Sequence, residues 1–164
     1  MKSKIVAVLL VTAVVAGCSS EEGTGAARPQ NILTAATLGE QSVLSNRDYL
    51  LQERYATADL ENGKTRAQLC KACHSLDAGG VHMIGPNLHG VFGKTAGKAE
   101  GFAYSQVLAD AEFVWTPRAL DAWLSAPGRF LPGNLMTFPG VQDAADRDDL
   151  IAYLLRFADA GVEQ

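Results

Sequence analysis

The clearest hydrophobic pattern lies close to the C-terminal end of the chain. Apolar side chains recur there at i, i+3, i+4 and i+7, the spacing of one helix face, at Leu150, Tyr153, Leu154 and Phe157. Acidic residues, which suit the positive end of a helix dipole, surround its start at Asp143, Asp146, Asp148 and Asp149, and Gly161 follows. The pattern predicts a long final helix that ends before this glycine.

Two shorter helices are predicted earlier in the chain. Residues 60–71 suit a helix that Asp59 caps at its N-terminus. Thr116 and Pro117 form an N-cap and first-turn pair, and Pro127 stops the helix that they open. Its apolar face consists of Leu120, Trp123 and Leu124.

Closely spaced glycines occupy the region between these two helices. Their number excludes a long regular element, and glycine allows a backbone to turn with positive φ and to approach a surface closely. We therefore expect this stretch to pack on something large, rigid and planar. The glycines are Gly79, Gly80, Gly85, Gly90, Gly93, Gly97 and Gly101.

The N-terminal residues have the pattern of an exported protein. Lys2 and Lys4 precede an apolar run over residues 5–16, which is too short to span a bilayer as a helix. We assign residues 1–17 to a signal peptide. The run ends in Val-Ala-Gly-Cys, which resembles the bacterial lipobox, so Cys18 is predicted to carry lipid. The alternative is ordinary cleavage near small residues, with Cys18 incidental.

Residues 18–58 are assigned to a lipidated cysteine and a flexible tether. The part from Ser19 to Gln30 is small and polar, without apolar periodicity. Residues 31–58 leave two possibilities, a short helix that lies on the domain or a loose segment. The apolar residues that decide between them are Leu44, Tyr49, Leu50, Leu51 and Tyr55.

Composition fits one folded domain, which we place at residues 59–164 and expect to be all-α. The chain has 164 residues, of which 48% are hydrophobic. Its formal net charge of −4 argues against a nucleic-acid partner. Its three cysteines are Cys18, Cys70 and Cys73.

The chemistry of the chain centres on Cys70-Lys71-Ala72-Cys73-His74. Two cysteines two residues apart, followed at once by histidine, have the spacing that attaches haem through two thioethers, with the imidazole on the iron. The alternatives are a dithiol, a disulfide or half a zinc site. A zinc site needs a second ligand pair, and a thioredoxin-like site needs a βαβ setting; the sequence shows neither.

A second axial ligand is expected among His82, His89, Met83 and Met136. Met136 is the best candidate because Pro-Gly pairs bracket it within residues 132–140 and form a stiff loop. The alternative for this methionine is filler in the hydrophobic core.

From about Gly63 to Ala158 the chain resembles a class I cytochrome c, close to the mitochondrial type. The resemblance rests on the haem motif, on Met136 and on two further stretches. These are Gly-Pro-Asn-Leu-His-Gly-Val-Phe-Gly at 85–93 and Gly-Phe-Ala-Tyr-Ser at 101–105. The resemblance implies an all-α class I fold around one covalent haem c. It also implies that the Pro86 carbonyl accepts the free ring N–H of His74.

The resemblance further implies roles for polar and aromatic residues around the haem. The Tyr104 hydroxyl and the Trp115 indole match positions that bond a propionate, although both would also suit an aromatic core. His82 and His89 match positions that are not ligands. Three positions depart from the family pattern. Trp123 stands where many relatives have tyrosine, and Lys94 stands where many have arginine. The first helix also lacks the usual aromatic residue near Arg66 and Ala67.

The function implied is a lipid-anchored monohaem carrier of single electrons in the bacterial periplasm, with the outer face of the inner membrane favoured. It has no catalytic residues and is expected to be a monomer. Its partners would be a cytochrome bc complex and a terminal oxidase or photosynthetic reaction centre. The alternatives are a haem peroxidase, or a donor to one, and a gas sensor. Both need an open or weakly held sixth position, and a dihaem peroxidase needs a second haem motif, which the sequence lacks.

The expected docking face also departs from the family. Mitochondrial relatives carry a ring of lysines around the exposed haem edge, which steers them to acidic partners. The matching positions here hold Leu69, Met83, Gly128 and Leu135, and only Arg129 keeps a charge. We expect a neutral, partly apolar edge.

Overall fold

The computed structural model describes residues 33–157. The predicted signal peptide, the predicted lipid site Cys18 and the tether up to residue 32 lie outside the described residues, as do residues 158–164.

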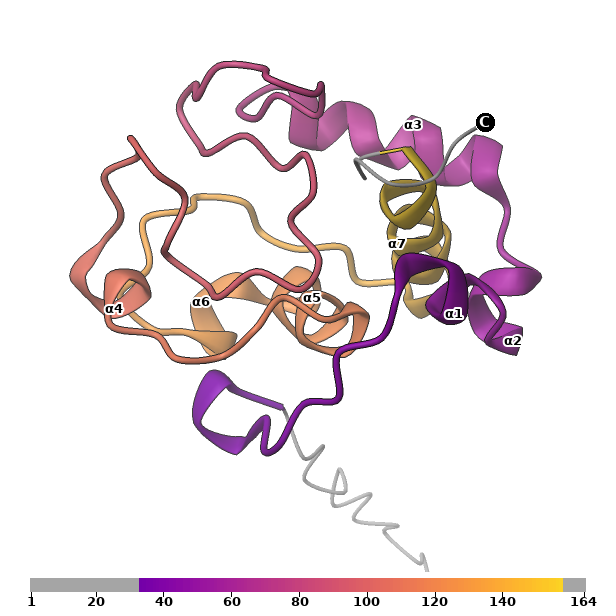
Figure 1. Cartoon of the computed structure of the whole chain (residues 1–164), viewed down its shortest axis with the longest axis horizontal. Helices are drawn as coiled ribbons and strands as arrows, with labels where there is room; N and C mark the ends of the chain where they lie inside the picture. Colours follow the sequence, from indigo (N-terminus) through magenta and orange to yellow (C-terminus); the bar gives the residue numbers. More distant parts are fainter. Residues whose placement is uncertain (1–32, 158–164) are drawn as a thin grey trace, which may run out of the picture. The chain divides into compact units, whose positions relative to one another are not determined.

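The described chain is helical. Its elements are η1 Ala35–Thr37, α1 Asn46–Leu50, α2 Glu53–Ala56, α3 Leu60–Lys71, α4 Gln106–Ala109, α5 Pro117–Ser125, α6 Pro127–Phe130 and α7 Ala144–Phe157 (Figure 1). Within residues 33–157 the only extended pairing is an isolated antiparallel bridge between Thr95 and Val114. The all-α fold expected from the sequence is confirmed.

Side-chain caps fix the starts of the predicted helices. The Asp59 carboxylate accepts the backbone N–H groups of Glu61 and Asn62 at 2.9 and 3.0 Å, so α3 begins where expected. The Thr116 hydroxyl accepts the N–H of Ala119 at 3.2 Å. Each cap satisfies donors that a helix N-terminus otherwise leaves unpaired. Pro127 does more than stop α5, since it also opens α6.

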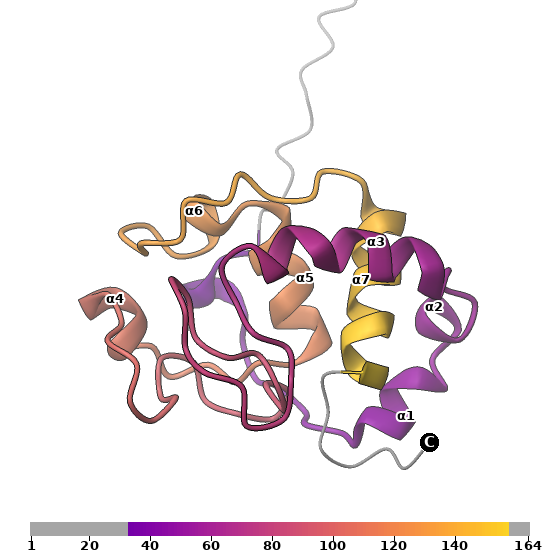
Figure 2. The same ribbon diagram turned by 90° about the horizontal axis from the view of Figure 1, so that it is seen from above.

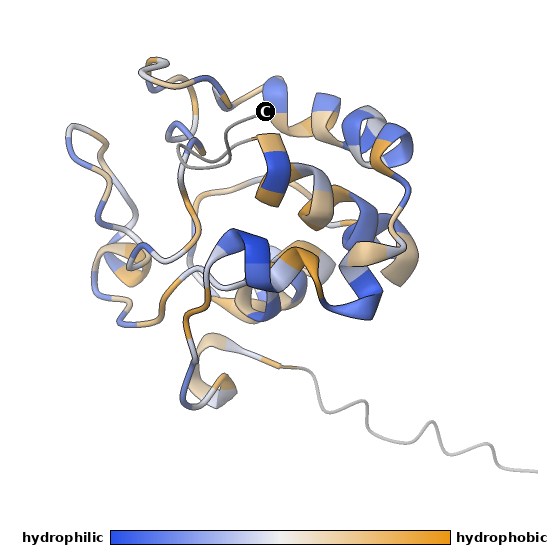
Figure 3. Ribbon diagram, turned by 45° about the vertical axis from the view of Figure 1, so that its right-hand side comes forward, coloured by the Kyte–Doolittle hydropathy of each residue, from blue (hydrophilic) through white to orange (hydrophobic). Residues whose placement is uncertain are grey.

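α7 is the central element because neighbours cover it on more than one side. α3 crosses it, and α1, α2 and α5 also contact it (Figure 2). The buried side chains of α7 are Leu150, Ile151, Ala152, Leu154 and Leu155. The sequence pattern therefore misplaced part of the buried face, since Tyr153 is only half-buried and Phe157 is exposed. Figure 3 shows that the helices of the domain carry both hydrophobic and hydrophilic residues.

The glycine-rich stretch has no helix between His74 and Ser105, as predicted. Gly79, Gly90, Gly93, Gly97 and Gly101 all have positive φ. At Gly97 a Cβ would lie 1.9 Å from the carbonyl oxygen of Leu108, so only glycine fits this turn. The sequence did not predict α4, a single turn that follows the stretch.

Residues 33–58 differ from the tether that the sequence suggested, because they pack on the helical domain. Leu38, Tyr49 and Tyr55 are buried in the common core. Arg54 of α2 forms ion pairs with Asp148 of α7 and Asp121 of α5. Of the two possibilities for this segment, the structure shows short helices on the domain. We call residues 33–58 the N-terminal strap.

None of the helices within residues 33–157 is long and apolar enough to cross a membrane.

Candidate functional site

The cysteine motif begins in the last turn of α3. The backbone N–H groups of Cys73 and His74 both donate to the carbonyl oxygen of Cys70, at 3.0 and 2.9 Å. This turn fixes the relative positions of the two thiols and the imidazole by local hydrogen bonds alone. Both thiols are free, so no disulfide joins them.

The chemistry of Cys70 does not fit a redox dithiol. Burial raises the pKa of its thiol to about 11; a backbone hydrogen bond opposes this rise, and the neighbouring Cys73 adds to it. Reactive CxxC cysteines instead have lowered pKa values, because the thiolate is the nucleophile. A zinc site also lacks support, since residues 33–157 hold no cluster of three ionisable ligands around one point.

His74 is held by the loop that follows it. Its Nδ1 lies 2.6 Å from the Pro86 carbonyl oxygen, so this nitrogen carries the proton and donates it. This is the hydrogen bond expected from the sequence resemblance. The backbone at Gly85 lies against the ring, because a Cβ there would lie 2.2 Å from His74 Cε1. Gly85 also donates its N–H to the Cys73 carbonyl oxygen at 2.8 Å, which sets the register of the loop.

The His74 imidazole is neutral at pH 7. Burial lowers its pKa, and the hydrogen bond to Pro86 opposes this only in part. With Nδ1–H donated to a carbonyl, the lone pair of Nε2 remains free to bind a metal. The carbonyl fixes the ring orientation and raises the basicity of Nε2.

Met136 lies on a loop stiffened by Asn134. The Asn134 side chain accepts the Met136 N–H at 2.9 Å and donates to the carbonyl oxygens of Pro127 and Leu131 at 2.9 and 2.8 Å. Gly133 and Gly140, on either side, both have positive φ. Met136 is half-buried against the core. The loop therefore holds a thioether, a soft metal ligand, in a fixed position.

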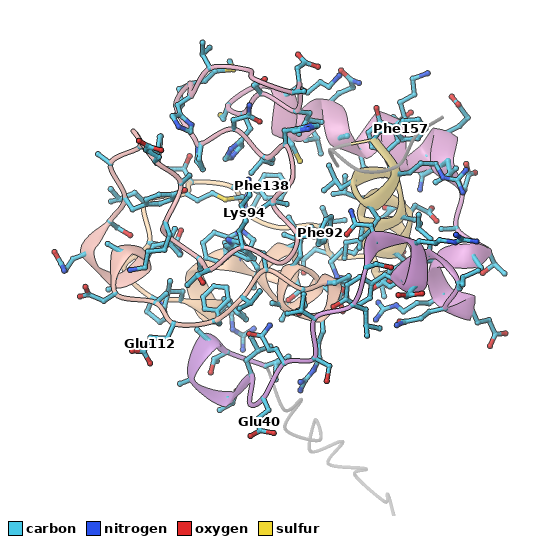
Figure 4. The ribbon with its side chains drawn as sticks, in the orientation of Figure 1. Glu40, Phe92, Lys94, Glu112, Phe138 and Phe157 are labelled. Atoms are coloured by element: carbon cyan, nitrogen blue, oxygen red, sulfur yellow. The ribbon has the colours of Figure 1, made fainter. Side chains whose placement is uncertain are left out.

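An aromatic cluster lies beside this loop. Trp115 meets Trp123 edge to face with ring centroids 5.5 Å apart, and Trp123 meets Phe130 in the same way at 5.9 Å. Trp123 is buried, whereas Trp115 is only half-buried. Phe138, from the Met136 loop, projects toward the middle of the view in Figure 4, as does Lys94. These rings form a stiff apolar wall.

Two polar groups of the candidate site, the Ser105 hydroxyl and the Trp115 indole N–H, lack hydrogen-bond partners in the described chain. The Ser105 hydroxyl oxygen is buried and has no hydrogen-bond partner within residues 33–157. No hydrogen bond of the described residues uses the Trp115 indole N–H. Burial raises the pKa of Tyr104, although a backbone hydrogen bond from Ala99 opposes this. Lys94 reaches only the His89 carbonyl oxygen, at 3.4 Å.

The other two histidines lie in the loops. His82 accepts the Asn87 N–H at 2.9 Å and donates to the Glu100 carbonyl oxygen at 2.8 Å, so both of its nitrogens are in use. This is the structural role expected from the sequence. Neither ring nitrogen of His89 has a partner within residues 33–157.

These residues fit a covalent haem. The motif offers two thiols and a neutral imidazole nitrogen, the wall is apolar, and the buried Ser105 hydroxyl is an orphaned donor suited to a carboxylate. Glycine at position 85 leaves the imidazole its space. Ser105 was not among the residues expected at the site, although its hydroxyl lies next to Tyr104 in the sequence.

The sequence was compared with known protein families. Residues 60–157 match the sequence model of the family described as Cytochrome c. The matched range runs from the start of α3 to the end of α7, and it leaves out the N-terminal strap.

Individual relatives align over similar ranges. Cytochrome c of Kluyveromyces lactis is 40% identical over 93 residues, which are 57% of this chain and 82% of that protein. Cytochrome c2 of Rhodoblastus acidophilus is 42% identical over 88 residues, covering 54% and 82%. A protein of Rhodobacter capsulatus named cytochrome c-type cyt cy is 41% identical over 99 residues, covering 60% of this chain and 49% of that protein.

Proposed function

Because this chain belongs to the cytochrome c family, we propose that it is a lipid-anchored electron carrier of a bacterial periplasm. Proteins of this family bind one covalent haem c and carry single electrons. The observation that supports the site most directly is the 2.6 Å hydrogen bond from His74 Nδ1 to the Pro86 carbonyl. It presents a neutral Nε2 within the motif that carries both thiols.

Each site residue has a distinct role in this proposal. Cys70 and Cys73 would hold the haem through thioethers, and His74 Nε2 and Met136 Sδ would bind its iron. Bound haem supplies the one-electron couple between Fe(II) and Fe(III). A thioether ligand favours Fe(II) and raises the potential. With His74 and Met136 both bound to it, the iron would have no open position for a substrate, which fits a carrier of single electrons.

Other residues orient the cofactor and exclude water. Trp123 and its aromatic neighbours form the apolar wall, and Pro86 orients His74. Tyr104, Trp115 and Lys94 are the proposed partners of the propionates, and the orphaned Ser105 hydroxyl joins them. Donors aimed at the propionates reduce the cost of burying those charges.

The proposed partners are redox proteins of a respiratory or photosynthetic chain. A cytochrome bc complex is the donor, and a terminal oxidase or a reaction centre is the acceptor. The carrier works as a monomer on the outer face of the inner membrane.

Lipid on Cys18 is the proposed anchor. Two or three acyl chains hold a protein firmly at a membrane, whereas one chain does not. Leu33 of the strap already packs against the core, and Cys18 is only 15 residues away from it in sequence. A fully extended link of that length spans at most about 50 Å. This limit is much shorter than that of a tether reaching residue 58, so the haem domain stays close to the membrane.

An absorption spectrum of the purified full-length protein tests the haem site. We expect a reduced c-type spectrum and, in the ferric state, the weak long-wavelength band of methionine sulfur on haem iron. Met136→Leu should abolish that band, whereas Met83→Leu, at an exposed methionine, should retain it. A high-spin ferric protein that binds carbon monoxide readily when reduced would instead support the sensor or peroxidase function.

The anchor requires a separate test. Cys18→Ser should release the protein from membranes or block its maturation, and the spectrum of any protein that matures should not change. Recovery of the unaltered protein in the soluble periplasmic fraction would contradict the anchor.

A further inference from the structure

The N-terminal strap contacts the segment that carries Trp115. Figure 1 shows the strap passing beside the chain that leads into α5. Gln41 makes the central contact: its Oε1 accepts the Val114 N–H at 2.8 Å, and its Nε2 donates to the Val114 carbonyl oxygen at 2.7 Å. The same Nε2 lies 2.9 Å from the Thr116 hydroxyl. The side-chain amide therefore pairs with Val114 as a neighbouring strand would.

The opposite edge of this segment is paired with backbone. Trp115 donates its N–H to the Lys94 carbonyl oxygen at 2.9 Å, and its own carbonyl accepts the Gly93 N–H at 3.0 Å. The segment 113–116 is thus held on one edge by residues 93–96 and on the other by Gln41. Without Gln41, the N–H of Val114 would have no partner from the described chain. The Val114 carbonyl oxygen would keep only the N–H of Thr116, which lies 2.9 Å away.

Further contacts hold the strap in this position. Arg118 of α5 donates to the Leu38 carbonyl oxygen at 2.9 Å, and the Leu38 side chain is buried. The Tyr49 hydroxyl donates to the Ser42 carbonyl oxygen at 2.9 Å. Gln41 therefore lies between two anchored points, which limits the entropy lost when its side chain is fixed.

We infer that Gln41 is a positioning residue of the haem site, acting through the backbone of Val114 on the Trp115 indole. The inference rests on the proposed function, because it needs a haem whose propionate the indole can bond. An N–H donor that is held in place offsets the negative charge of a propionate. If the donor is loosened, more negative charge remains near the iron, and Fe(III) is favoured over Fe(II).

The test measures the midpoint potential of the full-length haem protein. Gln41→Ala should lower the potential relative to the unaltered chain. Amide hydrogen exchange at Val114 should become faster by about fivefold, the effect of losing one ordinary hydrogen bond. This second measurement reports on the clamp without depending on the haem iron.

Asn46→Ala is the matched control. Asn46 is also a strap residue, and its side chain donates to the Leu155 carbonyl oxygen at 3.1 Å, at the end of α7. Its loss should weaken the attachment of the strap without changing the potential. Gln41→Glu tests the donor half of the amide, because the carboxylate can still accept the Val114 N–H but cannot donate to the Val114 carbonyl. Gln41→Glu should therefore lower the midpoint potential, as Gln41→Ala does.

A double-mutant cycle decides whether the effect passes through Trp115. In the Trp115→Phe background, Gln41→Ala should no longer change the potential. The inference is wrong if Gln41→Ala leaves the potential unchanged, if Asn46→Ala shifts it equally, or if the shift persists without the indole. These outcomes differ from a failure of the proposed function, in which the unaltered protein would contain no covalent haem.

Discussion

Gly63 of α3 lies so close to Asp149 of α7 that a Cβ on Gly63 would be 2.1 Å from the Asp149 carbonyl oxygen. The same Cβ would lie 2.9 Å from Cβ of Tyr153. This contact sets the distance at which the two longest helices cross. Since the closest atom belongs to a helix backbone, a rotamer change cannot relieve the clash.

Gly63→Ala should therefore destabilise the domain strongly. Overpacking usually costs about 1 to 3 kcal/mol, and the rigid backbone places this substitution at the upper end. Gly128→Ala is the control, since its added Cβ meets nothing within 4 Å. Denaturant unfolding of both variants measures the difference. Equal stability would show that the helices can separate at little cost.

Leu38→Ala tests whether the strap belongs to the folded domain. The Leu38 side chain is 1% exposed, although it lies outside the range that matches the family. Truncation of a buried leucine costs about 2 to 5 kcal/mol. Leu51→Ala, at a strap residue that is 72% exposed, should change the free energy of unfolding by less than about 0.5 kcal/mol. A strap that behaves as a tether would make both variants neutral.

The buried hydroxyl of Tyr55 should make the folded chain less stable at alkaline pH. Burial raises its pKa from 10.0 to about 12 in the folded chain. The contribution of Tyr55 to the free energy of unfolding is complete below pH 10 and is lost as pH rises toward 12. The reason is that the unfolded chain releases the hydroxyl proton of this tyrosine at a lower pH than the folded chain does. The loss is about 2 kcal/mol over this range. Denaturant unfolding from pH 9 upward should show a shallower decline for Tyr55→Phe; parallel declines would contradict the assignment.

Electron transfer should depend weakly on ionic strength. Leu69 is 53% exposed and Leu135 is 77% exposed, so the positions where relatives carry lysines present apolar side chains. Charge steering can raise association rates by about 10- to 1,000-fold at low salt. Proximity to the membrane replaces it in our proposal by raising the effective concentration. Oxidation by partner membranes across a salt series measures the dependence.

Charge variants make this test specific. With an acidic partner, Leu69→Lys together with Leu135→Lys should steepen the salt dependence. Leu51→Lys adds the same kind of charge at the end of α1, which packs on α7, and should have little effect. A steep salt dependence of the unaltered protein would contradict the apolar docking face.

For the strap, the sequence left open a short helix on the domain and a loose segment, because its elements are too short to show a period. α1 and α2 have only five and four residues. The buried face of α7 was partly misplaced for a different reason. Ile151 and Leu155 fall outside the expected stripe, and they are buried because neighbours pack on more than one side of the helix.

Features that depend on neighbouring residues could be predicted without the structure: the spacing of Cys70, Cys73 and His74, the caps at Asp59 and Thr116, and the glycine turns. These follow from covalent geometry and hydrogen bonds within a few residues. Contacts between residues far apart in the chain depend on the fold. Gln41 pairs with Val114, 73 positions away, because a side-chain amide can complete any exposed backbone edge, and the fold alone selects which edge it meets.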